Sequence, residues 1–229
     1  MASIPLSSAA RKPKPVRGKN MEGFIATLYA KNTAPVIPQF EAEARRYAAT
    51  LQPGAEVLEV APGPGYLAVA LAKAGDFRVS ALDYSHAFVR IGRENAAHAG
   101  VQVDFRQGNA SDMPYAANSF DLLICRAAFK NFGDPVGALR EMHRVLKPGG
   151  TAVIIDMRKN ATRREIYEEV DKMNQGAISA AFTRLALRDL RRRAYTRAEF
   201  ERMIAETPFG TTRISEGGIG FEIRLGKPA

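Results

Sequence analysis

The feature that most restricts the fold of this chain is a short loop rich in glycine and proline, residues 61–65. It joins an apolar segment to a segment with a helical pattern. Residues 57–60 before it are short and apolar, as a buried strand is, and the Ala- and Leu-rich residues 65–74 after it read as a helix. Gly63 and Gly65 let the backbone turn tightly and approach a ligand closely. A strand that passes through such a loop into a helix is typical of an open α/β sheet.

The chain continues to alternate between strands and helices. Helices are expected between the strands, one N-capped by Ser85 and one by Asp134. Two further helices precede the loop, at residues 21–30 and 40–51, and residues 147–150 end the helix before the fifth strand. Three helices follow the fifth strand, the last N-capped by Thr196. We predict an α/β fold with a Rossmann-like, mostly parallel seven-stranded sheet, a C-terminal antiparallel hairpin and helices on both faces. The strands are expected at residues 57–60, 78–82, 101–105, 120–125, 151–156, 211–215 and 219–225.

Charge divides the chain into a body and two basic parts. The formal net charge is +9. Residues 1–20 carry five basic residues and no acid, and residues 158–197 carry eleven basic residues and five acids. Residues 1–19 are therefore expected to form a disordered basic tail, with nucleic-acid or acidic-surface binding as the alternative and a short transit peptide as a minor one. Residues 20–229 are expected to form a single domain. Within it, residues 20–52 would form a helical lid and residues 158–195 a helical substrate cap.

Cysteine and histidine are too few for most metal or disulfide frameworks. Cys125 is the single cysteine, and the three histidines are scattered. We therefore expect no intramolecular disulfide and no metal site. No run of residues approaches the roughly 20 apolar positions that a membrane span needs. The sequence predicts no membrane span and a cytoplasmic location.

Asp83 adds a candidate ligand-binding carboxylate beside the loop. It follows the second predicted strand, 20 residues beyond Gly63, and its carboxylate suits a bidentate grip on ribose hydroxyls. A dinucleotide-binding site remains an alternative interpretation, because the spacing of Gly63, Gly65 and Ala68 also fits the loose dinucleotide fingerprint. Against NAD, an acid precedes the loop, a proline lies inside it, and the chain ends in a hairpin rather than a second nucleotide-binding half.

Residues 56–157 resemble class I S-adenosylmethionine-dependent methyltransferases of the ubiquinone/menaquinone-biosynthesis-like, small-molecule type. The family's first motif, acidic-x-Gly-x-Gly-x-Gly, reads Glu59-x-Ala61-x-Gly63-x-Gly65 here, and residues 108–114, 120–123 and 139–150 match later motifs. Ala61 departs from the motif, and its methyl group narrows the space beside the cofactor's amino-acid end. The resemblance implies S-adenosylmethionine as cofactor, held by Glu59, Ala61, Pro62, Gly63, Gly65, Asp83, Tyr84, Ser85, Asn109, Ala110 and Arg126.

Catalytic groups are less clear from the sequence. No histidine follows the fourth strand, so Lys130 and Asp156 are the candidates, with a surface lysine and a helix cap or ion-pair partner as their alternatives. The absence of a convincing acid–base pair favours a good nucleophile or catalysis by proximity.

Substrate contacts are expected from the two helical segments. Phe24 and Tyr29 would enter the pocket from the lid, unless they are core residues. Arg158, Arg184 and Arg188 would bind a carboxylate or phosphate, unless the arginines of the cap form a solvated face.

Three functions remain open at this stage. The favoured one is methyl transfer to a small and possibly anionic molecule by in-line displacement. An RNA methyltransferase is the second, supported by the basic residues but opposed by the 8% aromatic content and the lack of tryptophan. A protein that keeps the fold and binds the cofactor without methylating is the third. Nothing in the sequence fixes the oligomeric state.

Overall fold

The computed structural model describes residues 21–173 and 176–229, so the tail predicted at residues 1–19 lies outside the described residues. Seven strands form one sheet in the order β3-β2-β1-β4-β5-β7-β6. All neighbours pair in parallel except β7, which is antiparallel to both β5 and β6. This confirms the predicted fold class. The strands are β1 (Glu56–Val60), β2 (Arg78–Asp83), β3 (Asp104–Gln107), β4 (Phe120–Arg126), β5 (Leu146–Met157), β6 (Thr211–Gly217) and β7 (Gly220–Gly226).

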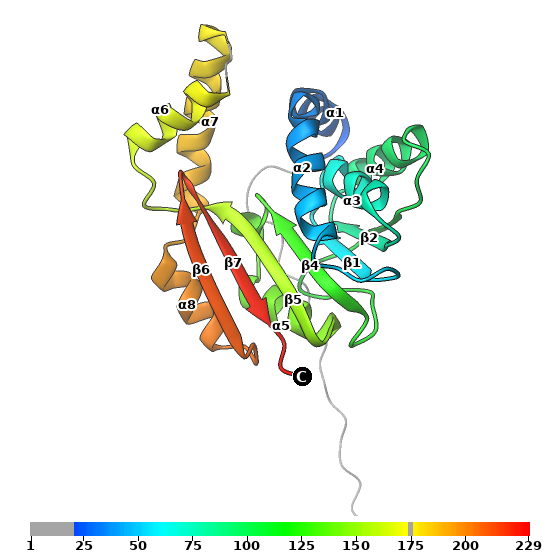
Figure 1. The fold of residues 1–229 in the computed structure, drawn as a ribbon. Coiled ribbons are helices and arrows are strands. Elements are labelled where there is room, and N and C mark those ends of the chain that lie inside the picture. Colours follow the sequence, from blue (N-terminus) through cyan, green and yellow to red (C-terminus); the bar gives the residue numbers. More distant parts are fainter. Residues whose placement is uncertain (1–20, 174–175) are drawn as a thin grey trace, which may run out of the picture.

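Helices cover both faces of the sheet and stand above its carboxyl edge (Figure 1). The caps predicted at Ser85, Asp134 and Thr196 are present, each accepting a hydrogen bond from a backbone N–H of the first turn. α6 and α7 project beyond the carboxyl ends of the parallel strands (Figure 1). The helical elements are α1 (Gly23–Thr33), η1 (Ala34–Val36), α2 (Ile37–Ala48), α3 (Tyr66–Ala74), α4 (His86–His98), η2 (Phe129–Asn131), α5 (Pro135–Val145), α6 (Arg163–Lys172), α7 (Ala177–Arg193) and α8 (Arg197–Ala205).

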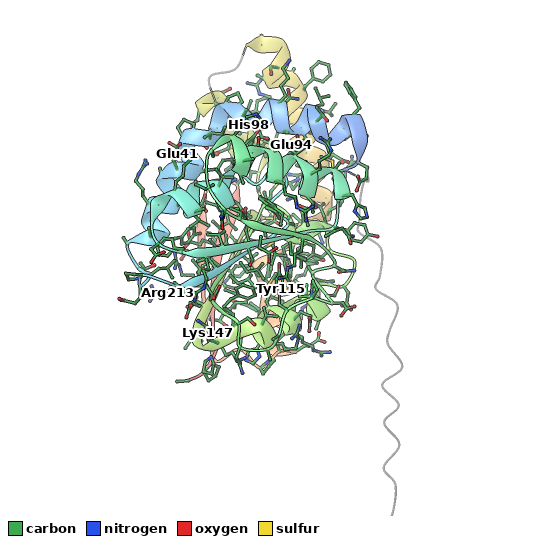
Figure 2. The ribbon with its side chains drawn as sticks, turned by 90° about the vertical axis from the view of Figure 1, so that its right-hand side faces the viewer. Glu41, Glu94, His98, Tyr115, Lys147 and Arg213 are labelled. Atoms are coloured by element: carbon green, nitrogen blue, oxygen red, sulfur yellow. The ribbon has the colours of Figure 1, made fainter. Side chains whose placement is uncertain are left out.

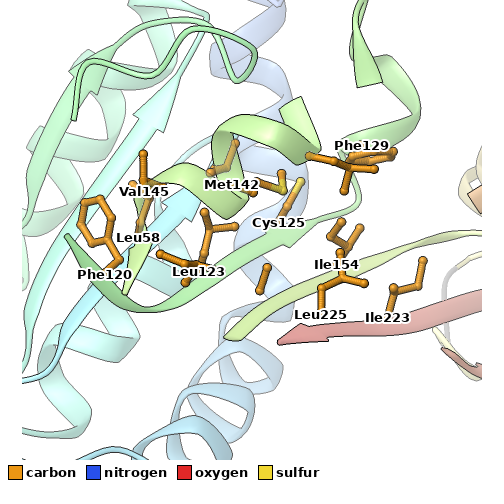
Figure 3. Packing of buried hydrophobic residues seen from close by; sticks show 14 of the residues in the cluster. Leu58, Phe120, Leu123, Cys125, Phe129, Met142, Val145, Ile154, Ile223 and Leu225 are labelled. Carbon is orange, nitrogen blue, oxygen red and sulfur yellow. The ribbon is translucent and has the colours of Figure 1, made fainter. Parts of the chain in front are cut away.

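The central strand β4 is buried on both faces and divides the core into two layers. Leu123 and Cys125 point into the layer covered by α5 and α8, shown in Figure 3. Leu122 and Ile124 point into the layer covered by α2, α3 and α4. Such continuous apolar character is what a strand buried on both faces requires. The packed sheet holds the carboxyl ends of its parallel strands at one edge, and the candidate functional site lies at this edge.

Three predicted element boundaries are wrong. β3 begins at Asp104 rather than residue 101, because the preceding valines pack against the core without entering the ladder. β5 begins at Leu146, so residues 147–150 extend the strand through an irregular register instead of only ending a helix. The predicted helix at residues 40–51 begins at Ile37, since Pro38 occupies a first-turn position that needs no N–H donor.

Candidate cofactor and acceptor cavity

A cavity of about 940 Å³ lies at the carboxyl ends of β1, β2 and β4, between α1 and α7. Its floor is the loop from β1 to α3. Of the predicted cofactor residues, all except Gly65 line it: Glu59, Ala61, Pro62, Gly63, Asp83, Tyr84, Ser85, Asn109, Ala110 and Arg126. The size falls within the range usual for sites of small ligands and cofactors.

Asp83 ties the loop to the end of β2. Its Oδ2 accepts a hydrogen bond from the Gly63 N–H at 3.0 Å, and its Oδ1 accepts one from the Ser85 N–H at 2.9 Å. The Ala61 N–H donates to the Leu82 carbonyl at 2.7 Å. These bonds fix the loop beside the strand end. Ala61 has φ +57°, a left-handed conformation that favours glycine, which explains why the family motif has glycine there.

Gly65 does not line the cavity; it serves packing. It occupies the N-cap position of α3 with φ +77°, and a Cβ there would lie 2.6 Å from Cζ of the buried Phe105 ring. The glycine is therefore required both by the backbone conformation and by the close approach of Phe105.

Replacing Gly65 with alanine is expected to lower the free energy of unfolding by about 1–2 kcal/mol for the left-handed backbone and by about 1–3 kcal/mol more for the clash. Gly54→Ala is the matched control, because Gly54 has the same φ of +77° and nothing within 4 Å of its added Cβ. Chemical unfolding of the two variants measures the difference. Equal losses would show that Phe105 moves aside at no cost.

Two buried carboxyl groups face the cavity. Glu59 is 3% exposed, and its Oε2 has no hydrogen-bond partner among the described residues. Burial, reinforced by the nearby Glu43, raises the pKa of Glu59 to about 8. Burial also raises the pKa of Asp83 to about 6, although backbone N–H groups of Ser85 and Gly63 oppose the shift. An unpartnered carboxyl of this kind suits a cationic ligand group that takes the place of its proton.

Glu43 on α2 was not predicted and is central to this network. It is 5% exposed, pairs with Arg126 at 3.0 Å, and accepts a hydrogen bond from the Tyr47 hydroxyl at 3.2 Å. The Arg126 guanidinium also stacks on the Phe40 ring, 4.9 Å from its centroid. The segment predicted as a lid therefore divides: α2 packs on α3 as part of the core and contributes only Phe40 to the cavity lining, and α1 contributes Tyr29 and Thr33.

The two predicted catalytic residues form a buried ion pair. The Lys130 Nζ lies 2.7 Å from Asp156 Oδ1, and the two side chains are 4% and 1% exposed. Lys130 Nζ also donates to the Ala127 carbonyl. Asp156 accepts from the backbone N–H groups of Lys130 and Met157. Lys130 lines the cavity and Asp156 does not.

Of the predicted substrate residues, only Tyr29 lines the cavity. Phe24 is 79% exposed on the outer side of α1. Arg158 binds the Gly218 carbonyl and Glu165. Arg184 pairs with Asp171 at 2.6 Å, and Arg188 is exposed outside the cavity lining.

The cavity face of α7 differs from the predicted arginine stripe. The residues of α7 that line the cavity are Ala186, Asp189, Leu190, Arg192 and Arg193, whereas Arg184 and Arg188 do not line it. Arg193 Nη1 donates to the Asn131 side-chain oxygen at 3.1 Å, which links α7 to η2. The run of arginines at the end of α7 indicated from the sequence that this helix borders the site. Which of these arginines faces the cavity depends on the rotation of α7 about its axis.

The described residues contain no helix long and apolar enough to cross a membrane. In the same part of the chain, no group of three or more His, Cys, Asp or Glu side chains could hold a metal ion.

Comparison with known proteins matches part of the chain to a family model. Residues 58–154 match the family model described as a methyltransferase domain. Demethylmenaquinone methyltransferase of Chlorobaculum parvum is 34% identical over 114 residues, which is 49% of this chain and 46% of that protein. The Listeria monocytogenes protein of the same name is 36% identical over 109 residues, covering 46% of each chain. The chain thus spans about half the length of the curated relatives it matches.

Solved structures extend the likeness in fold beyond the matched residues. A candidate S-adenosyl-L-methionine-dependent methyltransferase from Methanococcus maripaludis superposes with a TM-score of 0.71 at 24% identity, over 93% of this chain and 96% of that one. A methyltransferase from Aquifex aeolicus gives a TM-score of 0.67 at 20% identity, over 89% of this chain and 99% of that one. At these identities the likeness shows the fold.

Proposed function

We propose that this chain, whose residues 58–154 belong to the methyltransferase domain family, binds S-adenosylmethionine and transfers its methyl group to a small-molecule acceptor. The observation that carries the proposal is the buried carboxyl of Glu59, whose Oε2 has no hydrogen-bond partner among the described residues. It lies beside the loop that Asp83 fixes, at the floor of a cavity large enough for a cofactor and an acceptor. The names of the Chlorobaculum and Listeria relatives support the small-molecule class of acceptor.

The residues present fit this cofactor. Glu59 offers a carboxyl oxygen to a cationic amino group, and Asp83 offers its remaining acceptor positions to ribose hydroxyls. A Cβ at Gly63 would lie 3.8 Å from Tyr29, so the glycine leaves open space between the loop and α1. Asn109 and Ala110 border the same cavity and would contact the adenine end.

The cofactor supplies an activated methyl group on a sulfonium. The chain then has three tasks: to hold the donor, to place the acceptor in line with it, and to exclude water. Tyr29, Phe88 and Phe132 give the cavity apolar walls. The Lys130 Nζ already donates to Asp156 Oδ1 and to the Ala127 carbonyl. We propose that Lys130 orients or stabilises an acceptor oxygen instead of acting as a general base.

Calorimetric titration with S-adenosylmethionine, with NAD as the control, tests the binding step. We expect micromolar-range binding of the first ligand and none of NAD. Transfer of a labelled methyl group to a panel of small phenols, quinols and amines tests the reaction itself. A preference for NAD would overturn the proposal, and tight binding without transfer would favour a cofactor-binding protein that does not methylate. We also propose a cytoplasmic setting for this reaction, since the fold depends on no disulfide.

The raised pKa of Glu59 predicts an unusual pH dependence of stability. Between pH 6 and pH 8 the folded, ligand-free chain holds a proton on Glu59 that the unfolded chain, with a pKa of 4.5, has released. The free energy of unfolding should therefore fall as the pH rises, by about 1.4 kcal/mol per pH unit. Cofactor affinity should rise over the same range, because a cationic amino group displaces that proton.

Chemical unfolding at several pH values checks this expectation. Glu59→Gln should remove most of the slope, since glutamine does not titrate. Glu41→Gln is the matched control: Glu41 lies on the exposed side of α2 (Figure 2), and its replacement should leave the slope unchanged. A slope that persists in Glu59→Gln would mean that another group holds the proton.

A further inference from the structure

The large hydrophobic side chains that are exposed in the described part of the chain gather around one side of the molecule. All of them lie on α1, after β2, after α6 or on α7, the elements at the carboxyl edge of the sheet (Figure 1). Contiguous exposed apolar groups on a protein mark an interaction site. They are Phe24, Ile25, Leu28, Tyr29, Tyr84, Met173, Phe182 and Leu185.

On α1, the exposed apolar groups continue the wall of the cavity outward. Ala26 and Ala30 form the buried side of this helix, and Tyr29 lines the cavity. Ile25 lies one helical turn before Tyr29 and so extends the same face. Phe24 and Leu28 adjoin it and are 79% and 46% exposed.

The opposite wall repeats this arrangement on α7. Ala186 and Asp189 line the cavity. Phe182 and Leu185 lie one turn before them and are 70% and 62% exposed. We call Phe24, Ile25, Leu28, Phe182 and Leu185 the apolar rim. Its two halves flank the mouth of the cavity, so an apolar molecule leaving the mouth would meet the rim first.

Basic residues outnumber acidic ones on the two helices of the apolar rim, although Arg184 is paired with Asp171 and Arg193 with Asp189. α7 carries five arginines and one acid, Asp189, and α1 carries Lys31 and no acid. Arg192 is 81% exposed at the side chain. Residues 1–20, which directly precede α1 in the chain, add five basic residues and no acid. Apolar groups flanked by arginine and lysine are the composition of a helix that lies in the interface of an anionic bilayer.

We propose that the apolar rim docks this protein on an anionic lipid bilayer, with the cavity mouth facing the lipid. Given the proposed function, on which this part rests, the acceptor is then an apolar molecule that passes from the bilayer between α1 and α7 into the cavity. A second copy of the chain fits the rim less well, because a two-fold contact would bring the arginines of one α7 against those of the other.

Flotation of the full-length chain with lipid vesicles tests the docking. The chain should bind vesicles of phosphatidylcholine mixed with phosphatidylglycerol, and bind weakly to phosphatidylcholine alone. Replacing Phe182 and Leu185 together with serine should lower the affinity about tenfold or more, while Phe182→Leu should retain it. Arg188→Gln should weaken binding, whereas Arg213→Gln, on the exposed edge strand β6 (Figure 2), should not.

Several results would overturn the docking proposal. One is equal vesicle affinity of the double serine variant and the unchanged chain. Another is an affinity that falls only when the five basic residues at 11–19 are neutralised. A third is a rim-dependent dimer in sedimentation without lipid. Calorimetry with S-adenosylmethionine on the unchanged chain separates the two proposals: no cofactor binding together with intact flotation would reject the proposed function alone.

Discussion

Replacing Asp156 with alanine is expected to lower the free energy of unfolding by about 3–5 kcal/mol, because it leaves the buried ammonium of Lys130 without its counter-ion. The two side chains are 4% and 1% exposed, so water does not replace the lost carboxylate. Two backbone N–H groups, those of Lys130 and Met157, also lose their acceptor. The loss should appear as a lower midpoint in chemical unfolding.

Glu94→Ala is the control for this prediction. The Arg90–Glu94 pair has nearly the same separation, 2.7 Å, but its side chains are 60% and 51% exposed. Exposed pairs contribute about 0–1 kcal/mol, so this variant should remain close to the unchanged chain. If Asp156→Ala does not fold, Asp156→Asn gives a second measurement, since its amide keeps an acceptor oxygen. A loss no larger than that of Glu94→Ala would show that Lys130 reaches solvent.

The location of the Lys130–Asp156 ion pair indicates its structural role at the cavity wall. Lys130 lies in η2 after β4, and Asp156 lies near the end of β5, so their ion pair joins the turn after one central strand to its neighbour. Ala127 in that turn has φ +56°, and its N–H donates to the Ile155 carbonyl at 2.7 Å. We therefore propose that Asp156 is a positioning residue that holds Lys130 and the cavity wall, which is the ion-pair alternative considered for it from the sequence.

The fold was predictable because its signals are local in the chain. Apolar strand runs, the loop glycines and cap residues such as Ser85 each act within a few positions. The start of β3 was predicted too early, because Val101 and Val103 fit the pattern of a strand but pack against the core without hydrogen bonds to the neighbouring strand. The sequence pattern does not separate these two uses of an apolar side chain.

The cavity lining near the loop was predictable for the same reason, and the lining contributed by α1 and α7 was not. Glu59 near the end of β1 is close in the chain to Ala61 and Gly63 of the loop, so their positions follow once the strand and helix are assigned. The lining from the two helices depends on how α1 and α7 rotate about their own axes, which places Arg193 toward the cavity and Arg188 away from it. Glu43 was missed because its partner, Arg126, lies on another element far along the chain.

Asp83→Ala should weaken S-adenosylmethionine binding by about 3 kcal/mol or more, roughly a hundredfold, in the calorimetric titration. Hydrogen bonds to a charged group are each worth about 1.5–3 kcal/mol, and the proposal assigns two ribose hydroxyls to this carboxylate. The same substitution also frees the Gly63 N–H, so the loop loses its tie to β2. Asp104→Ala is the control, because Asp104 pairs only with the exposed Arg106 at the end of β3 far from the cavity lining.

Asp83→Asn separates a binding role from a folding role. Because burial raises the pKa of Asp83 from 3.8 to about 6, the ionised carboxylate makes the ligand-free fold less stable above pH 6 than it is below pH 4. Asparagine removes that charge but offers one acceptor oxygen to the two backbone N–H groups of Gly63 and Ser85. At pH 8 the relief of the buried charge and the loss of one hydrogen bond oppose each other, so stability should change little while cofactor affinity falls. Equal losses of stability and affinity would show that Asp83 only holds the loop. A gain in stability with a loss in affinity would identify a carboxylate kept in an unfavourable place for the ligand it binds.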